Sequence, residues 1–166
     1  MEIKRRFNLL SLRNILILVY FVCFAVFLSF GLKPAEAANY EISAELSIPA
    51  ISLKSDVTTL KLKEHGLETP DYIVGSFMRS DNKTLLIGHS STVFARLREV
   101  EISNTVVYDD TIYTIVDKRV VEKTEIDMNS LLEGTDKETI VLMTCAGKDL
   151  PNKDSAHRLI ITAEAV

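Results

Sequence analysis

Short runs of β-branched and aromatic residues, separated by turn residues, make up most of the chain after Tyr40. Such runs are typical of β-strands, and Asp109-Asp110 between two of them is typical of a tight turn. We expect strand residues at 46–48, 51–53, 84–87, 105–108, 111–116, 120–121, 139–144 and 159–163. A domain of many short strands must protect its sheet edges. The pattern therefore predicts a mainly all-β fold, a closed or nearly closed β-barrel.

Helical signals in the same region are few and short. Ser90 or Ser91 is expected to cap a turn over residues 94–97. Asp127 is expected to cap a short helix over residues 128–132. We therefore expect one or two short helices beside the barrel.

Residues 15–32 form an apolar run of about the length that a helix needs to cross a bilayer. Basic residues before the run would hold that end in the cytoplasm. This predicts a cytoplasmic segment 1–14, a single-pass membrane anchor 15–32, a linker 33–43 and an extracytoplasmic domain 44–166. The small-x-small stretch Ala35-Glu36-Ala37 supports an alternative, a secretory signal that is cleaved after Ala37.

The charge distribution argues against nucleic acid as a partner. The formal net charge is -4, and residues 1–37 hold five cations and two anions, so the remainder is the more acidic part. Phosphate binding needs clustered Lys and Arg. Trp is absent and aromatic residues make up 7%, which also disfavours platforms for base stacking.

The two cysteines have different settings. Cys23 lies inside the apolar N-terminal run, whereas Cys145 lies near the C-terminus. Cys145 is thus a single thiol in the extracytoplasmic part, which is a candidate for a reactive group. A buried and inert cysteine is the alternative, since free cysteine is among the most buried residue types.

Three chemically useful residues are expected at strand ends. His89 follows the strand that ends at Gly88, Cys145 follows the strand 140–144, and Arg158 opens the last strand. A thiol needs a proton acceptor or an imidazolium neighbour to act as a thiolate at neutral pH. A fixed cation can stabilise a developing oxyanion. Strand ends of one small barrel can converge on one pocket, although the spacing alone does not establish this.

The local sequences around these residues occur in a recognisable order. They are Leu86-Ile87-Gly88-His89, then Leu142-Met143-Thr144-Cys145, then His157-Arg158-Leu159-Ile160-Ile161-Thr162-Ala163. The pattern resembles the sortase family of cysteine transpeptidases. Further matches are 46–51 with its Ile-Pro step, 67–70, and 94–97. The resemblance covers roughly residues 44–166, with departures at Val141 and at Ser103-Asn104 that leave the subclass open.

The resemblance implies an eight-stranded barrel and a thioester mechanism. Cys145 would attack a sorting-signal peptide of a secreted surface protein, commonly Leu-Pro-x-Thr-Gly-like, at the bond after Thr. An amine acceptor, such as a peptidoglycan precursor or a pilin lysine, would then resolve the acyl-enzyme. By this resemblance His89 transfers protons and Arg158 stabilises the oxyanion. The substrate-binding residues would be Thr144, Ala146 and Ser90.

Two loops take roles from the same resemblance. Residues 123–137 would help to form the peptide groove, and residues 146–156 would border the amine side.

The other ionisable residues point to no cofactor. No Cys or His spacing suggests zinc. Glu99, Glu101 and Glu125 are the candidates for a calcium site of the kind that some sortases have, but nothing in the sequence favours one. His65 is expected in a loop. His157 is expected to point away from the Arg158 face, and it is the rival to His89.

Three other functions are weighed against a sortase. An L,D-transpeptidase would carry a Ser-His-Gly-Cys-like stretch, whereas Leu142-Met143-Thr144 precedes Cys145 here. A sortase-like protein that only binds its partner would not need His89, Cys145 and Arg158 together. An unrelated anchored domain would have an unreactive Cys145.

Overall fold

The computed structural model describes residues 17, 40–64, 66–80, 82–146 and 156–166. The predicted cytoplasmic segment, the anchor, the cleavage site and most of the linker lie outside these ranges. Within the described part of the chain, no helix has both the length and the apolar character needed to cross a membrane. Residues Tyr40–Val166 form one compact unit, which is described below.

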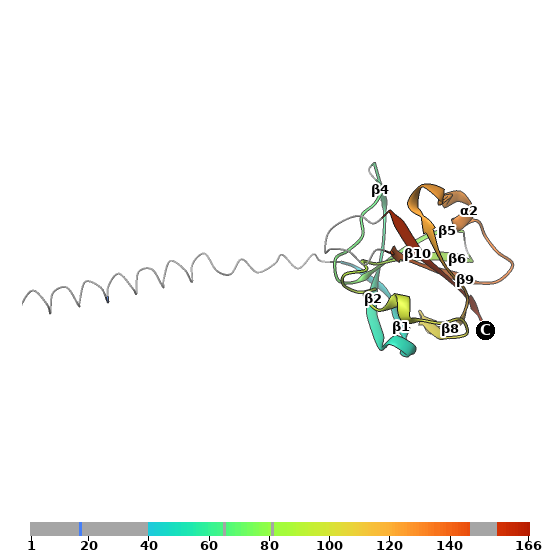
Figure 1. Cartoon of the computed structure of the whole chain (residues 1–166), viewed down its shortest axis with the longest axis horizontal. Coiled ribbons are helices and arrows are strands. Elements are labelled where there is room, and N and C mark those ends of the chain that lie inside the picture. Colours follow the sequence, from blue (N-terminus) through green and yellow to red (C-terminus); the bar gives the residue numbers. More distant parts are fainter. Residues whose placement is uncertain (1–16, 18–39, 65, 81, 147–155) are drawn as a thin grey trace, which may run out of the picture. The chain divides into compact units, whose positions relative to one another are not determined.

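This unit is a closed barrel in the strand order β1-β2-β5-β6-β9-β10-β8-β7 (Figure 1). The strands are β1 (Ile42–Ile48), β2 (Leu53–Thr59), β5 (Val74–Ser80), β6 (Lys83–Ile87), β7 (Thr105–Tyr108), β8 (Thr111–Glu122), β9 (Thr139–Cys145) and β10 (His157–Ala165). The predicted eight-stranded barrel is therefore confirmed. Closure leaves no strand of the sheet without a partner on either side.

Besides the barrel strands, the unit contains short helices and a two-stranded pair. They are η1 (Pro49–Ile51), the two-stranded pair β3 (Leu62–Lys63) and β4 (Gly66–Leu67), η2 (Leu97–Glu99), η3 (Lys123–Glu125) and α2 (Met128–Leu132). The Asp127 side chain accepts a hydrogen bond from the backbone N–H of Asn129 at 2.9 Å, so the predicted cap of α2 is confirmed.

The turn between β7 and β8 is the predicted Asp109-Asp110 pair. Both residues have positive φ, 48° and 63°. Hairpins favour such turns because their twist matches that of the two strands, and Asp tolerates the left-handed region better than most residues. β8 then continues to Glu122, which confirms that 120–121 extends the sheet.

β9 and β10 bury both of their faces. Ile140, Leu142, Leu159 and Ile161 point into the barrel and belong to its main core. Val141 and Ile160 point outward and pack with Leu85 against Leu131 and Leu132 of α2. These strands are therefore nearly continuous runs of apolar residues, which is the pattern that strands covered on both faces show.

Four details differ from the expectation. Ile51 lies in η1 rather than in a strand, because Pro49 starts a turn of 3₁₀-helix there. β1 begins at Ile42, before the expected strand at 46–48. Residues 94–96 are turns, and helical structure begins only at Leu97. β5 was not predicted, because Gly75 and its polar neighbours give it no clear apolar pattern.

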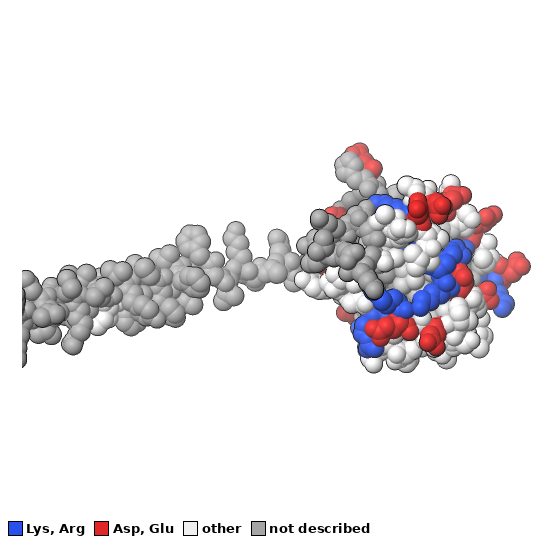
Figure 2. Space-filling view, in the orientation of Figure 1, with Lys and Arg blue, Asp and Glu red and all other residues white. Residues whose placement is uncertain are grey.

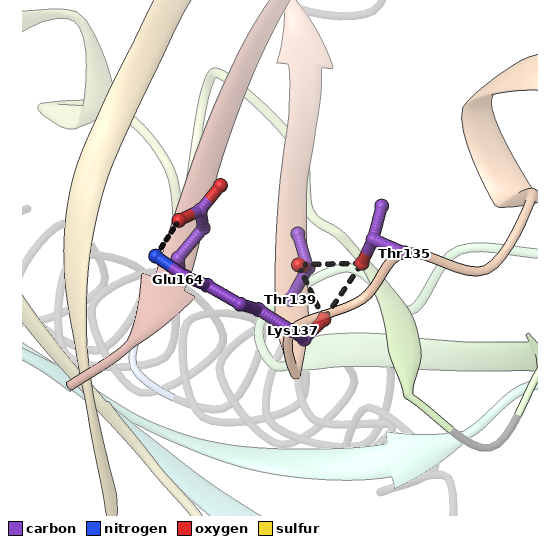
Figure 3. Close-up of polar contacts among 4 residues, drawn as sticks. All are labelled: Thr135, Lys137, Thr139 and Glu164. Carbon is purple, nitrogen blue, oxygen red and sulfur yellow. Dashed lines mark hydrogen bonds and ion pairs between the residues drawn. The ribbon is translucent and has the colours of Figure 1, made fainter.

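The loop between α2 and β9 is fixed by the polar contacts in Figure 3. The hydroxyls of Thr135 and Thr139 both donate to the backbone oxygen of Lys137, at 2.7 and 3.0 Å. The Lys137 ammonium contacts the Glu164 carboxylate of β10 at 2.9 Å. The end of the segment that carries η3 and α2 is thus tied to the strands it packs beside.

Candidate active site

Cys145 and Arg158 are direct partners in the antiparallel ladder of β9 and β10. Residues paired in this way project from the same face of the sheet, with Cβ atoms about 4.5–5.5 Å apart. Alternation along β9 puts Cys145 on the outer face with Val141 and Met143. The structure therefore brings the predicted nucleophile and the predicted cation together at the end of β9.

His89 reaches the same end of the sheet from β6. β6 and β9 are parallel, with Ile87 paired to Met143, so His89 and Cys145 both lie two residues beyond this pair. The Thr144 hydroxyl donates to the backbone oxygen of Gly88 at 2.7 Å, across 56 positions of sequence. The three predicted catalytic residues thus lie in, or two residues after, three adjacent strands, with His89 after β6, Cys145 in β9 and Arg158 in β10.

The backbone at His89 is held from its other side. The N–H groups of Thr92 and Phe94 donate to the His89 carbonyl at 3.2 and 3.0 Å, so the turn that follows folds back on it. A Cβ added to Gly88 would lie 2.6 Å from Val93 Cγ1 and 2.7 Å from Phe94 Cδ2. Gly is therefore needed before His89 because the turn packs directly against its backbone.

Asp71 is a neighbour of His89 that nothing in the sequence indicated. Its Oδ1 lies 3.8 Å from His89 Nε2, and the side chains are 83% and 43% exposed. The Thr92 hydroxyl donates to the Asp71 backbone oxygen. Water screens an ion pair between groups this exposed, so this contact contributes little to stability.

A pocket of about 320 Å³ opens beside Cys145. All three predicted substrate-binding residues, Ser90, Thr144 and Ala146, line it together with the cysteine. His89 and Arg158 are not among its lining residues. The pocket brings together the side chains for which the sequence predicted substrate contact.

Five further lining residues were not indicated by the sequence. They are Phe94, Arg98, Lys118, Val120 and Leu159. Lys118 Nζ donates to the backbone oxygens of Arg98 and Val100, at 2.7 and 2.8 Å. These contacts join β8 to η2, which are far apart in the sequence, so local sequence patterns do not predict them.

A second pocket, of about 240 Å³, lies on the outer face of the sheet. Val121, Val141 and Ile160 form its floor, and Ile126 and Leu131 of the η3–α2 segment form a wall. Part of the predicted groove loop, 123–137, therefore borders a hollow on the face that carries Cys145 and Arg158. The stretch 147–155 of the predicted amine-side loop lies outside the described residues.

The remaining candidates lie as follows. Among the residues that the structure describes, no group of three or more His, Cys, Asp or Glu side chains could hold a metal ion. Glu99 is engaged by Arg96 at 2.7 Å, and this hydrogen bond holds the pKa of Glu99 below its ordinary value. His157 is exposed and pairs with Glu122, and it lies one position before Arg158, so the two project from opposite faces. His65 is outside the described residues.

Comparison with protein-family models matches residues 46–166 to the sortase domain. No curated protein matches the sequence. Among solved structures, sortase A from Corynebacterium diphtheriae aligns with a TM-score of 0.59 and 22% identity, over 78% of this chain and 63% of that protein. The chain thus spans less than two thirds of the length of that relative.

Two further solved structures show the same fold. Sortase A from Listeria monocytogenes aligns with a TM-score of 0.58 and 18% identity, over 75% of this chain and 87% of that one. Sortase C-1 from Actinomyces oris aligns with a TM-score of 0.57 and 22% identity, over 80% and 76%.

Proposed function

Because the chain belongs to the sortase family, a family of cysteine transpeptidases, we propose that it cleaves a sorting-signal peptide and transfers the acyl part to an amine. In this proposal Cys145 is the nucleophile, His89 transfers protons and Arg158 stabilises the oxyanion. The observation that carries it is the direct pairing of Cys145 with Arg158, beside the end of β6 that holds His89.

The chemistry follows from these positions. The Cys145 thiol gives its proton to His89 and its sulfur attacks the peptide carbonyl, whose oxygen gains negative charge that the Arg158 guanidinium balances. The C–N bond then breaks, His89 gives a proton to the departing amine, and a thioester remains on Cys145. An acceptor amine attacks the thioester and loses a proton to His89, the C–S bond breaks as the new amide forms, and His89 returns the proton to the sulfur, which restores the thiol.

The outer-face pocket suits the acyl part of the peptide. An extended peptide rises about 3.3 Å per residue, so four residues before the scissile bond span about 13 Å. Val141 lies four residues before Cys145 on β9, which is the same distance along the strand. An apolar side chain at the far end of a Leu-Pro-x-Thr segment would therefore reach the floor formed by Val141 and Ile160.

The remaining parts of the proposal concern place and partners. The enzyme is tethered to the cell membrane by residues 15–32, with its catalytic domain outside. Its substrates are sorting-signal peptides of secreted surface proteins. Its acceptor is an amine of the cell envelope, such as a peptidoglycan precursor or a pilin lysine. The mechanism uses no cofactor, because the thiol, imidazole and guanidinium supply each step.

The test uses the full chain in detergent and a library of quenched peptides with Leu-Pro-x-Thr-Gly and its variants. Intact mass should reveal an acyl adduct that Cys145→Ala abolishes. His89→Ala and Arg158→Ala should lower turnover by about 100-fold or more. His157→Ala is the matched control, because His157 does not share the face of Arg158, and it should retain activity.

One result would favour the alternative, an unrelated anchored domain with an unreactive Cys145, over this proposal. It is the lack of an adduct with every peptide, together with a Cys145 that resists a thiol reagent in the folded protein.

A further inference from the structure

The pocket beside Cys145 has two cationic side chains in its wall and no acidic one. Arg98 and Lys118 line it together with Ser90, Thr144 and Cys145. This is unexpected in a chain with a formal net charge of -4. On the face of the domain shown in Figure 2, Lys and Arg side chains likewise gather into a band between acidic ones. The wall of this pocket therefore favours a negatively charged group next to the reactive sulfur.

The surrounding contacts do not cancel this positive charge. Lys118 Nζ donates to the carbonyl oxygens of Arg98 and Val100, which are neutral acceptors. The acidic neighbour Glu99 is held by Arg96, through hydrogen bonds of 2.7 and 3.0 Å to its Oε2. This carboxylate is hydrogen-bonded to Arg96 rather than to Arg98, although the charge of Arg98 also acts on it. Both side chains line the pocket wall and can contact a ligand there.

The pocket lies on the opposite side of β9 from the outer-face pocket. Thr144 and Leu159, which line it, point inward, whereas Val141 and Ile160 of the other pocket point outward. Cys145 ends the strand and lines this inner pocket, whereas its place in the alternation of β9 is on the outer face. If the acyl part of the peptide occupies the outer face, the departing amine lies on the inner side. The incoming amine takes the same path in reverse.

Two effects then act on an acceptor in this pocket. Nearby cations disfavour an ammonium and so favour the free amine, which is the form that attacks a thioester. The same cations attract a carboxylate carried by the acceptor through charge-assisted hydrogen bonds. The volume of about 320 Å³ is at the small end of ligand pockets, so amine and carboxylate must lie close together.

We infer that this pocket selects an acceptor amine whose own molecule carries a carboxylate within one or two residues. A peptide end or a diamino-dicarboxylic acid residue has this chemistry. A lysine side chain on the surface of a folded protein does not have it by itself. The inference rests on the proposed transpeptidase function, and it adds the class of acceptor and the residue, Arg98, that recognises it.

The test compares two acceptors, glycylglycine and glycylglycinamide, which differ in the carboxylate. With one quenched peptide, the partition of the acyl-enzyme between aminolysis and hydrolysis is measured for each acceptor. The preference for glycylglycine over its amide should fall about ten-fold in Arg98→Gln, the factor that one charge-assisted hydrogen bond contributes. Arg98→Lys should retain most of the preference, because it keeps the charge.

Lys54→Gln is the control for net charge, since Lys54 lies on β2, is 72% exposed and does not line this pocket. It should keep the wild-type preference. An unchanged preference in Arg98→Gln, or an equal loss in Lys54→Gln, overturns the inference while the transpeptidase function stands.

A binding measurement decides the inference even if no acyl-enzyme forms. In the full chain carrying Cys145→Ala, the backbone amide signals of Ser90, Arg98 and Ala146 are followed by NMR during titration with each dipeptide. Saturable shifts with glycylglycine that weaken in Arg98→Gln support the inference. Equal shifts with both dipeptides overturn it. Failure to acylate with any sorting peptide, together with a Cys145 that resists a thiol reagent, would instead remove the proposed function.

Discussion

The hydrogen bond from Thr144 to Gly88 offers a sharp test of how the site is held. Thr144 is 4% exposed, and its hydroxyl donates to the Gly88 carbonyl at 2.7 Å. Replacement by Val keeps the branched shape and leaves that buried carbonyl without this donor. We expect Thr144→Val to lose about 1–3 kcal/mol of unfolding free energy, because a buried polar group loses its partner. For a domain of this size that is a fall in Tm of roughly 3–15 °C.

The same bond fixes the residue before His89 to the residue before Cys145. A displacement of about 1 Å at a reacting group can cost about 100-fold in rate. We therefore expect Thr144→Val to slow acylation by about 10–100-fold at a temperature where the variant is fully folded. The assay is the rate of adduct formation by intact mass, at saturating peptide, beside a thermal melt followed by circular dichroism.

Thr58→Val is the matched control. Thr58 is 5% exposed, and its hydroxyl donates to the Glu41 carbonyl at 2.8 Å, between β2 and the residue that precedes β1. It should lose a comparable amount of stability and keep the wild-type acylation rate. Equal acylation by the two variants would refute the idea that this bond sets the position of His89. A melt of Thr144→Val that matches the wild type would refute the energy assigned to it.

Three other predictions concern stability. Gly88→Ala should lose about 1–3 kcal/mol by overpacking, since the new Cβ would lie 2.7 Å from Phe94 Cδ2; an unchanged melt would contradict it. Leu142→Ala, at a fully buried core position, should lose about 2–5 kcal/mol in urea unfolding, and a loss below about 1 kcal/mol would show that the core refills the space. Burial, and then the hydrogen bond to the Glu138 carboxylate, raise the pKa of Tyr113 above its ordinary value of 10.0. The folded state therefore binds this proton more tightly than the unfolded chain, and the stability it contributes below pH 10 is lost as the pH rises further. The urea midpoint should consequently fall less in Tyr113→Phe than in the wild type between about pH 9.5 and about pH 11; equal falls would mean that Tyr113 does not contribute.

The barrel was largely predictable because most of its strands carry a strong local signal. β9 reads as an unbroken apolar run, and the Asp109-Asp110 turn between β7 and β8 is marked by its own residues. β5 escaped prediction for a tertiary reason. A Cβ on Gly75 would lie 2.6 Å from the Leu60 side chain, so only glycine fits at this position without a shift. Glycine in a strand weakens the sequence pattern by which the strand would be predicted.

The site was predictable only in part. Local sequence placed His89, Cys145 and Arg158 at strand ends, and the structure puts these ends on adjacent strands. Adjacency itself follows from the parallel pairing of β6 with β9, which no local pattern encodes. The pocket wall formed by Arg98 and Lys118 was not predicted either, because it depends on the tertiary contact between β8 and η2.

The position of β10 has a consequence for how the chain reaches its active form. β8 and β9 are synthesised first, yet they do not pair with each other, because β10 lies between them. Until residues 157–165 are available, the edges of β8 and β9 that pair with β10 have no partner, and Cys145 has no arginine opposite it. Pairings between distant segments form late, since the entropy of loop closure is lost before the new contacts stabilise the chain. A chain still being synthesised therefore carries a thiol without its guanidinium, and the pair of Cys145 with Arg158 forms in the same folding event that closes the barrel.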